Sequence, residues 1–145
     1  MRRLALVLVL ALFTCALAAC GSGHKKSSNG PDAQAQIKSA YQKFFSSKTS
    51  LPDRVALLQN GPKFKTVIQA FASNPLAKNV TVDVSSVTLQ GANNAKVAYV
   101  VKFSGSSLPK QNGTAVRENG TWKVGFASLC KLVALGGSPP AACTS

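Results

Sequence analysis

The stretch TAVRENGTWKV, residues 114–124, decides the fold because its alternating side chains and central Asn119-Gly120 pair predict a β-hairpin. Two registers are open to this hairpin. A two-residue loop would place Arg117 opposite Trp122, whereas a three-residue loop that also includes Glu118 would pair Val116 with Trp122. A slip of one residue turns every side chain of a strand to the other face of the sheet, so the register determines which residues face the core.

The three-residue loop gives the more consistent apolar pattern, since it also pairs Thr114 with Val124 and places Arg117 and Lys123 together on the opposite face. The side chains that it gathers on one apolar face are Val116, Trp122, Val124 and Phe126. We therefore predict the three-residue loop, with Gly120 in the left-handed conformation that this turn requires.

Two more strands are predicted before the hairpin. In residues 80–89 the apolar positions change parity at Ser85-Ser86, so we expect a β-bulge or bend that returns both apolar sets to one face. In residues 96–103 the side chains that alternate inward are Val97, Tyr99, Val101 and Phe103. Together with the hairpin these segments predict a curved, four-stranded antiparallel sheet.

Helical periodicity precedes the strands. A first helix begins at Asp32 and places Ile37, Tyr41, Phe44 and Phe45 on one face. A second covers residues 51–59 with Ser50 as its N-cap, a third covers residues 63–73, and a short apolar helix follows at residues 128–135. The order predicts an α+β fold with N-terminal helices packed on the curved antiparallel sheet and a short C-terminal helix.

The first 19 residues are typical of a bacterial lipoprotein signal peptide. Arg2 and Arg3 precede an apolar run of sixteen residues, which is shorter than the roughly 20 that a membrane-spanning helix requires. The run ends in Leu-Ala-Ala-Cys, residues 17–20, which resembles the bacterial lipobox. We expect cleavage before Cys20, lipid attachment to its thiol, and a location on the outer, extracytoplasmic face of the cell membrane.

The domain organisation follows from this signal. Residues 1–19 are expected to be removed, and residues 20–31, rich in Gly, Ser and Asn, form a lipidated flexible tether. Residues 32–145 then form a single α+β domain. Cys15 is lost with the signal and Cys20 is lipidated, so we expect the two remaining thiols, Cys130 and Cys143, to form a disulfide rather than stay free in an oxidising compartment.

The mature chain is strongly basic, with 15 lysine and arginine residues against four acidic ones, a formal charge of +11. The predicted register gathers a basic outer face on the sheet, consisting of Lys96, Lys102, Arg117 and Lys123, with Asp83 as an acidic neighbour. Anionic lipid or an acidic envelope polymer would suit this charge, and a homodimer could also use the face. The alternative is a solvated exterior that only keeps the protein soluble. Nucleic acid is excluded because Tyr99 and Trp122 face inward and offer no stacking platform.

The helix of residues 35–45, the segment of residues 51–61 and the ENGTWKV strand with Cys130 behind it resemble the nuclear-transport-factor-2-like, cystatin-related superfamily. More narrowly, residues 33–135 resemble the low-molecular-weight secreted antigen family of mycobacteria and related actinobacteria. The superfamily resemblance implies a bent sheet that wraps a long helix into a cone. It also implies that the cone of its enzymes, such as isomerases and dehydratases, holds an Asp, Glu or His base.

This chain lacks such a base. His24 lies in the tether, Asp32 and Asp53 begin helices, and Glu118 lies at a turn, so we predict no catalytic residues, no metal site and no cofactor. We expect a non-catalytic envelope lipoprotein that binds an apolar ligand or a partner, the alternatives being an isomerase or dehydratase and a structural, dimerising module. The aromatic residues that either line a pocket in the cone or simply fill the core are Tyr41, Phe45, Phe71, Tyr99, Trp122 and Phe126.

Overall fold

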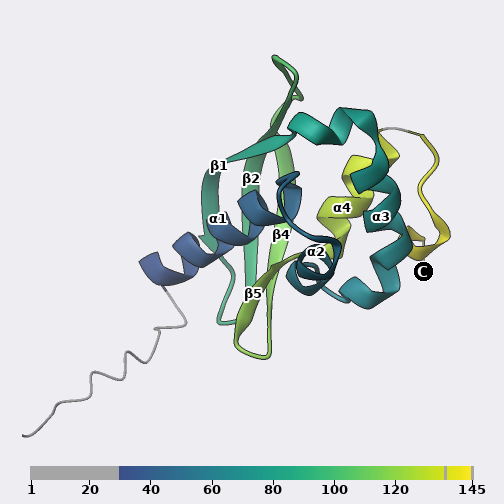
Figure 1. Cartoon of the computed structure of the whole chain (residues 1–145). Coiled ribbons are helices and arrows are strands. Elements are labelled where there is room, and N and C mark those ends of the chain that lie inside the picture. Colours follow the sequence, from purple (N-terminus) through teal and green to yellow (C-terminus); the bar gives the residue numbers. More distant parts are fainter. Residues whose placement is uncertain (1–29, 136, 145) are drawn as a thin grey trace, which may run out of the picture.

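The computed structural model describes residues 30–135 and 137–144 of the chain (Figure 1). The predicted signal peptide, the lipid attachment at Cys20 and all but the end of the tether lie outside the described residues.

Helices begin and end the described chain, and strands lie between them, as the α+β prediction requires. The helices are α1 (Pro31–Phe45), α2 (Leu51–Leu57), α3 (Lys65–Ser73) and α4 (Phe126–Ala134), with 3-10 turns η1 (Gly61–Phe64), η2 (Pro75–Asn79) and η3 (Ala141–Cys143). The strands are β1 (Thr81–Leu89), β2 (Asn94–Phe103), β3 (Ser106–Ser107), β4 (Gln111–Glu118) and β5 (Thr121–Val124). The predicted fold class is confirmed.

The sheet has the antiparallel order β1-β2-β4-β5, and the two-residue strand β3 adds to β2. It curls into a half-barrel around α1, which contacts both β1 and β5 at its opposite edges. The other helices gather beyond one end of this half-barrel, with α3 and α4 next to the C-terminal segment (Figure 1). The core therefore forms between α1 and the concave face of the sheet.

The predicted β-bulge in the first strand is present. The register between β1 and β2 shifts between Val84 and Ser86, so that Ser85 has no direct partner. Before the shift Val84 pairs with Tyr99, and after it Val87 pairs with Val97. The extra residue returns the second apolar set of β1 to the concave face, which is the outcome that the parity change predicts.

The predicted register of the last hairpin is wrong. Arg117 pairs with Trp122 and Glu118 with Thr121, so the loop consists of Asn119 and Gly120 alone. Both loop residues have positive φ, 50° and 79°, which is the type I′ conformation favoured in two-residue hairpins. Val116 consequently lies opposite Lys123 on the outer face rather than opposite Trp122 on the core face.

Small residues on β4 explain why the apolar pattern predicted the wrong register for this hairpin. On the core face of β4, Ala115 lies opposite Val124 and Gly113 lies opposite Val97 of β2, and both are buried. A Cβ at Gly113 would collide with Ser128 Oγ and the Tyr41 hydroxyl, which fill this space from α4 and α1. The core face of β4 is thus completed by neighbouring side chains, and the larger Val116 is left outside.

The corrected register also changes the predicted basic face. Lys96, Lys102 and Lys123 lie on the outer face, but Arg117 has the opposite parity and its Nε donates to the Gly120 carbonyl at 3.3 Å. Lys123 forms an ion pair with Glu118 at 3.0 Å, and Lys102 forms one with Asp83. Acidic neighbours therefore partly neutralise the face.

The middle helices are shorter than predicted. Ser50 caps α2 by accepting a hydrogen bond from the Asp53 amide at 3.3 Å, as predicted, but the helix ends at Leu57. Leu58 is extended, because residues 58–59 bridge to β5, where the Gln59 amide donates to the Val124 carbonyl at 2.8 Å. Gly61 then follows, where a Cβ would overlap the Val55 carbonyl, so only glycine permits this close approach.

Candidate functional site

Aromatic side chains fill the half-barrel beneath α1. Tyr41 and Phe45 are fully buried, and Tyr99 and Trp122 are 1% and 3% exposed. The rings of Tyr41 and Tyr99 lie 5.1 Å apart, and those of Phe45 and Tyr99 lie 6.0 Å apart. Four of the six aromatic residues predicted to line a pocket or fill the core are therefore core residues.

The Tyr41 hydroxyl is held by hydrogen bonds inside this core. It donates to the Thr114 carbonyl at 2.7 Å and lies 3.0 Å from Ser128 Oγ, which also accepts from the Thr114 amide at 2.9 Å. Burial raises the pKa of the Tyr41 hydroxyl far above its ordinary value and outweighs the opposing effect of the Ser128 hydrogen bond. The phenol stays protonated and joins α1, β4 and α4.

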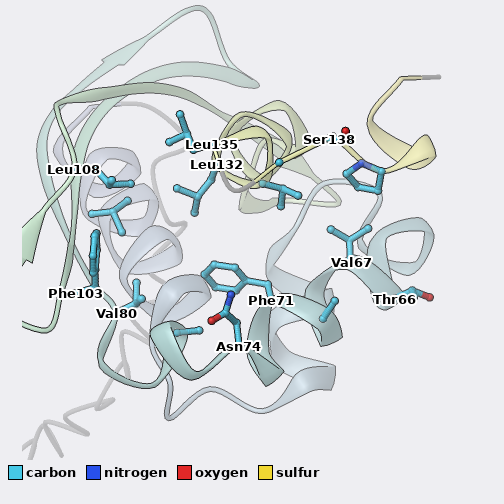
Figure 2. Close-up of a pocket in the computed structure, with 16 residues that line it drawn as sticks. Thr66, Val67, Phe71, Asn74, Val80, Phe103, Leu108, Leu132, Leu135 and Ser138 are labelled. Atoms are coloured by element: carbon cyan, nitrogen blue, oxygen red, sulfur yellow. The ribbon is translucent and has the colours of Figure 1, made fainter.

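A pocket of about 620 Å³ opens at the other end of the half-barrel, between α3, the ends of β1 and β2, α4 and the C-terminal segment. Figure 2 shows Phe71 pointing into the space between these walls, with Leu132 on the far side. The lining residues are Thr66, Val67, Ala70, Phe71, Asn74, Ala77, Val80, Val101, Phe103, Leu108, Leu132, Val133, Leu135, Gly137, Ser138 and Pro140.

Only Phe71 of the six predicted aromatic residues lines this pocket. Phe126, the remaining member of the set, is half-buried and stacks on Phe64, with ring centroids 5.6 Å apart. Of the two alternatives for these residues, the filled core holds for Tyr41, Phe45, Tyr99 and Trp122, and the apolar pocket lies beside the cone rather than inside it. Sequence reasoning did not identify Leu132, Val133 and Leu135 as lining residues, although all three lie in the apolar helix predicted at residues 128–135.

The chemistry of the pocket is simple because its lining contains no charged side chain. Thr66, Asn74 and Ser138 supply its polar side chains, all of them exposed, while the deeper walls are aliphatic and aromatic. A volume of about 620 Å³ lies within the 300–1,000 Å³ typical of small-molecule sites. The arrangement can bury an uncharged apolar group but offers nothing that would compensate a buried charge.

The predicted disulfide is confirmed, and it lies next to this pocket. Cys130 on α4 is bonded to Cys143 in η3, with their Cα atoms 5.5 Å apart. The bond turns the C-terminal segment back toward α4, where Ala142 and Cys143 pack against the core. The segment enclosed by the bond includes Ser138 and Pro140, which form part of the pocket lining.

Acidic residues are absent from both the core and the pocket. Asp32, Asp53 and Asp83 are exposed, and Glu118 is half-buried in its ion pair with Lys123 on the outer face. The isomerase or dehydratase hypothesis requires a carboxylate inside the cone, and none of the four acids of the chain lies there. Within residues 30–135 and 137–144 no cluster of three or more His, Cys, Asp or Glu side chains could hold a metal ion.

Arg54 is the buried cation of the described chain. Its side chain is 4% exposed and donates from Nη2 to the Ser46 carbonyl at 2.6 Å. Its Nε and Nη1 have no hydrogen-bond partner among the described residues, and burial lowers its pKa. The contact ties α2 to the loop after α1, and Arg54 is not part of the pocket lining.

The fold and the site together define the class of protein: a curled α+β domain that has a filled aromatic core and a separate apolar pocket. Residues 30–140 match the family model of the low molecular weight antigen MTB12, C-terminal domain, and the chain belongs to this family. The resemblance to the antigen family is thereby confirmed. No curated protein matches the chain significantly. In the part of the chain that the structure describes, no helix has the length and apolar character needed to cross a membrane.

Proposed function

We propose that the mature protein is a non-catalytic, lipid-anchored module on the extracytoplasmic face of the cell membrane that holds an apolar ligand in the pocket between α3 and α4. The proposal that the protein binds a ligand rests on one observation, the pocket itself, which has a volume of about 620 Å³ and an uncharged lining. Its walls come from segments far apart in the sequence, so the folded domain presents a preformed cavity rather than a surface groove of one helix.

The anchor rests on the Leu-Ala-Ala-Cys stretch, residues 17–20, after a short apolar run. One acyl chain holds a protein on a membrane only marginally, while two or more hold it stably, at about 0.8 kcal/mol per buried methylene. A diacylglyceryl group on Cys20 would satisfy this requirement. The Gly- and Ser-rich tether would then let the domain move above the bilayer surface.

The anchor is tested by Cys20→Ser in the full-length protein expressed in its native host. We expect loss of labelling by a radioactive fatty acid and release of the protein from the membrane fraction. Cys15→Ser is the matched control, because Cys15 precedes the cleavage site and should leave labelling unchanged. A Cys20→Ser protein that is still acylated would overturn the anchor without bearing on the pocket.

The ligand is tested by native mass spectrometry of the protein purified from its own envelope, where we expect a co-purified apolar molecule. Binding of the uncharged fluorophore N-phenyl-1-naphthylamine provides a second measurement. Ala70→Trp should fill the pocket and weaken binding at least tenfold, because Ala70 is exposed within the lining. Ala72→Trp on the same helix is exposed but outside the lining, so it should bind as the unsubstituted protein does.

If both variants bind the fluorophore equally, the pocket between α3 and α4 is not its site. If the purified protein carries no ligand and binds no fluorophore, the ligand-binding function is wrong. Either result would leave the family membership and the fold unchanged.

A further inference from the structure

One wall of the pocket belongs to a C-terminal strap, defined here as Leu135 and residues 137–143. The strap follows α4 and then runs beside α3 along the edge of the pocket (Figures 1 and 2). It contributes Leu135, Gly137, Ser138 and Pro140 to the lining. Leu135, at its beginning, is 61% exposed, so a large apolar side chain stands at the edge of the pocket rather than in the core.

The strap is held mainly from its far end. The hydrogen bonds between described residues of the strap and its neighbours close locally. The amides of Leu135, Gly137 and Cys143 donate to the carbonyls of Leu132, Ala134 and Pro140, and the Ala141 carbonyl accepts from Thr144. Such bonds shape the strap but do not fix its position relative to α3. The Cys130–Cys143 disulfide anchors the end of the strap to α4, which also carries the lining residues Leu132 and Val133.

Resting on the proposed ligand-binding function, we propose that the Cys130–Cys143 disulfide is a redox-sensitive clasp that keeps the strap closed over the bound apolar ligand. Reduction by a dithiol opens it. A reagent thiolate attacks one cysteine sulfur, the S–S bond breaks, and a mixed disulfide forms. The second reagent thiol displaces the protein sulfur, so that two electrons and two protons pass to Cys130 and Cys143 while the dithiol becomes a disulfide.

The clasp predicts that the oxidised and reduced proteins share one core but differ at the pocket. After reduction the only covalent connection of the strap to the domain is through α4, and among the described residues its far end is held by the packing of Ala142 and Cys143 alone, so the strap can leave its place at the pocket. The walls formed by Ser138 and Pro140 are then lost, and the apolar ligand is exposed to water. Tyr41 and Trp122 are buried beneath α1 and lie outside the lining, so their environment should not change.

The experiment compares N-phenyl-1-naphthylamine binding by the folded domain before and after reduction with dithiothreitol. We expect the Kd to rise at least tenfold, together with faster amide hydrogen exchange in residues 137–144 and unchanged exchange in β2. The fluorescence of Trp122, the only tryptophan, should report an intact core in both states. The double variant Cys130→Ser, Cys143→Ser should reproduce the reduced protein without reagent.

The outcomes separate the clasp from the function on which it rests. Equal Kd values for the oxidised and reduced proteins would overturn the clasp alone, as would unchanged hydrogen exchange in the strap. Absence of binding even by the oxidised protein would overturn the proposed function and the clasp with it. If the double variant fails to fold, the reduced native chain with unchanged Trp122 fluorescence still decides the question.

Discussion

Two apolar regions of this molecule lie against the same sheet and differ in what occupies them. Around Tyr41, aromatic side chains from α1 and β2 pack directly on one another and a hydrogen-bonded hydroxyl completes the core. Around Phe71, the walls stand apart across about 620 Å³. The difference arises from spacing: α1 lies on the concave face, whereas α3 faces α4 and a disulfide-bound segment. Apolar composition alone therefore does not distinguish a core from a pocket.

The largest expected effect comes from emptying the filled region. Tyr41→Ala removes a fully buried ring and the hydroxyl that joins three elements, so we expect the free energy of unfolding to fall by about 3–5 kcal/mol. Urea unfolding followed by Trp122 fluorescence measures this change. A loss below about 1 kcal/mol would mean that the region around Tyr41 is not the tightly packed core described above.

Tyr41→Phe separates the ring from its hydroxyl. The phenylalanine keeps the aromatic contacts but leaves the Thr114 carbonyl and Ser128 Oγ without the hydroxyl, so we expect a loss of about 1–2 kcal/mol. The difference between the two variants then gives the contribution of ring packing. Equal losses for both variants would assign the stability to the hydrogen bonds instead.

The second effect concerns the disulfide that borders the open region. Cys130 and Cys143 are 13 residues apart, and removing a cross-link of this span lowers the free energy of unfolding by about 3 kcal/mol. We expect this loss in the double variant Cys130→Ser, Cys143→Ser, measured by urea unfolding. Because the bond constrains the unfolded chain, the loss should occur even though the core around Tyr41 keeps its packing. A much smaller loss would show that the unfolded chain gains little freedom without the bond.

The third effect uses the two tyrosines of the chain, both buried in the filled region. Burial raises the pKa of Tyr99 from 10.0 to about 12 and that of Tyr41 still further. The native state therefore keeps protons that the unfolded chain loses, so this contribution to stability is complete below the unfolded pKa and is lost as the pH rises from about 10 toward 12. We expect tyrosinate absorbance to appear together with unfolding in this range.

Tyr99→Phe is the control for the alkaline transition, since it removes one of the two titrating groups while keeping the ring. It should reduce the slope of stability against pH above about 10. Tyrosinate absorbance that develops in a protein still folded by Trp122 fluorescence would contradict the burial of both hydroxyls.

The sequence predicted the fold correctly where one residue pattern had one physical solution. In β1 the parity change at Ser85-Ser86 could be reconciled with a buried face only by a bulge or a bend, and a bulge is present. The last hairpin had two solutions. Its register depended on whether Gly113 and Ala115 could face the core, which in turn depended on Tyr41 and Ser128, far away in the sequence. The apolar pattern within the hairpin holds no information about Tyr41 and Ser128, so it could not decide between the two registers.

The site was harder to predict than the fold, because a pocket depends on the space that remains between elements after they pack. Phe45 and Phe71 have the same side chain and both lie on helices with an apolar face, yet one is fully buried and the other is half-buried at the pocket. The Cys130–Cys143 pair could be predicted from the expected removal of Cys15 and the expected lipidation of Cys20. The position of this disulfide beside the pocket could not be predicted, because that position depends on how α4 packs against α3.

The smallest expected effect compares one substitution in the two regions. Phe71→Ala removes a half-buried ring that already faces open space, so it should lower the free energy of unfolding by only about 1 kcal/mol. Phe45→Ala is the matched control in the filled region, where the same truncation should cost about 3–5 kcal/mol. Because the two rings are in edge contact, 6.4 Å apart, the double variant should lose slightly less than the sum. Equal losses at the two positions, measured by urea unfolding, would mean that the region around Phe71 closes in solution and is no pocket.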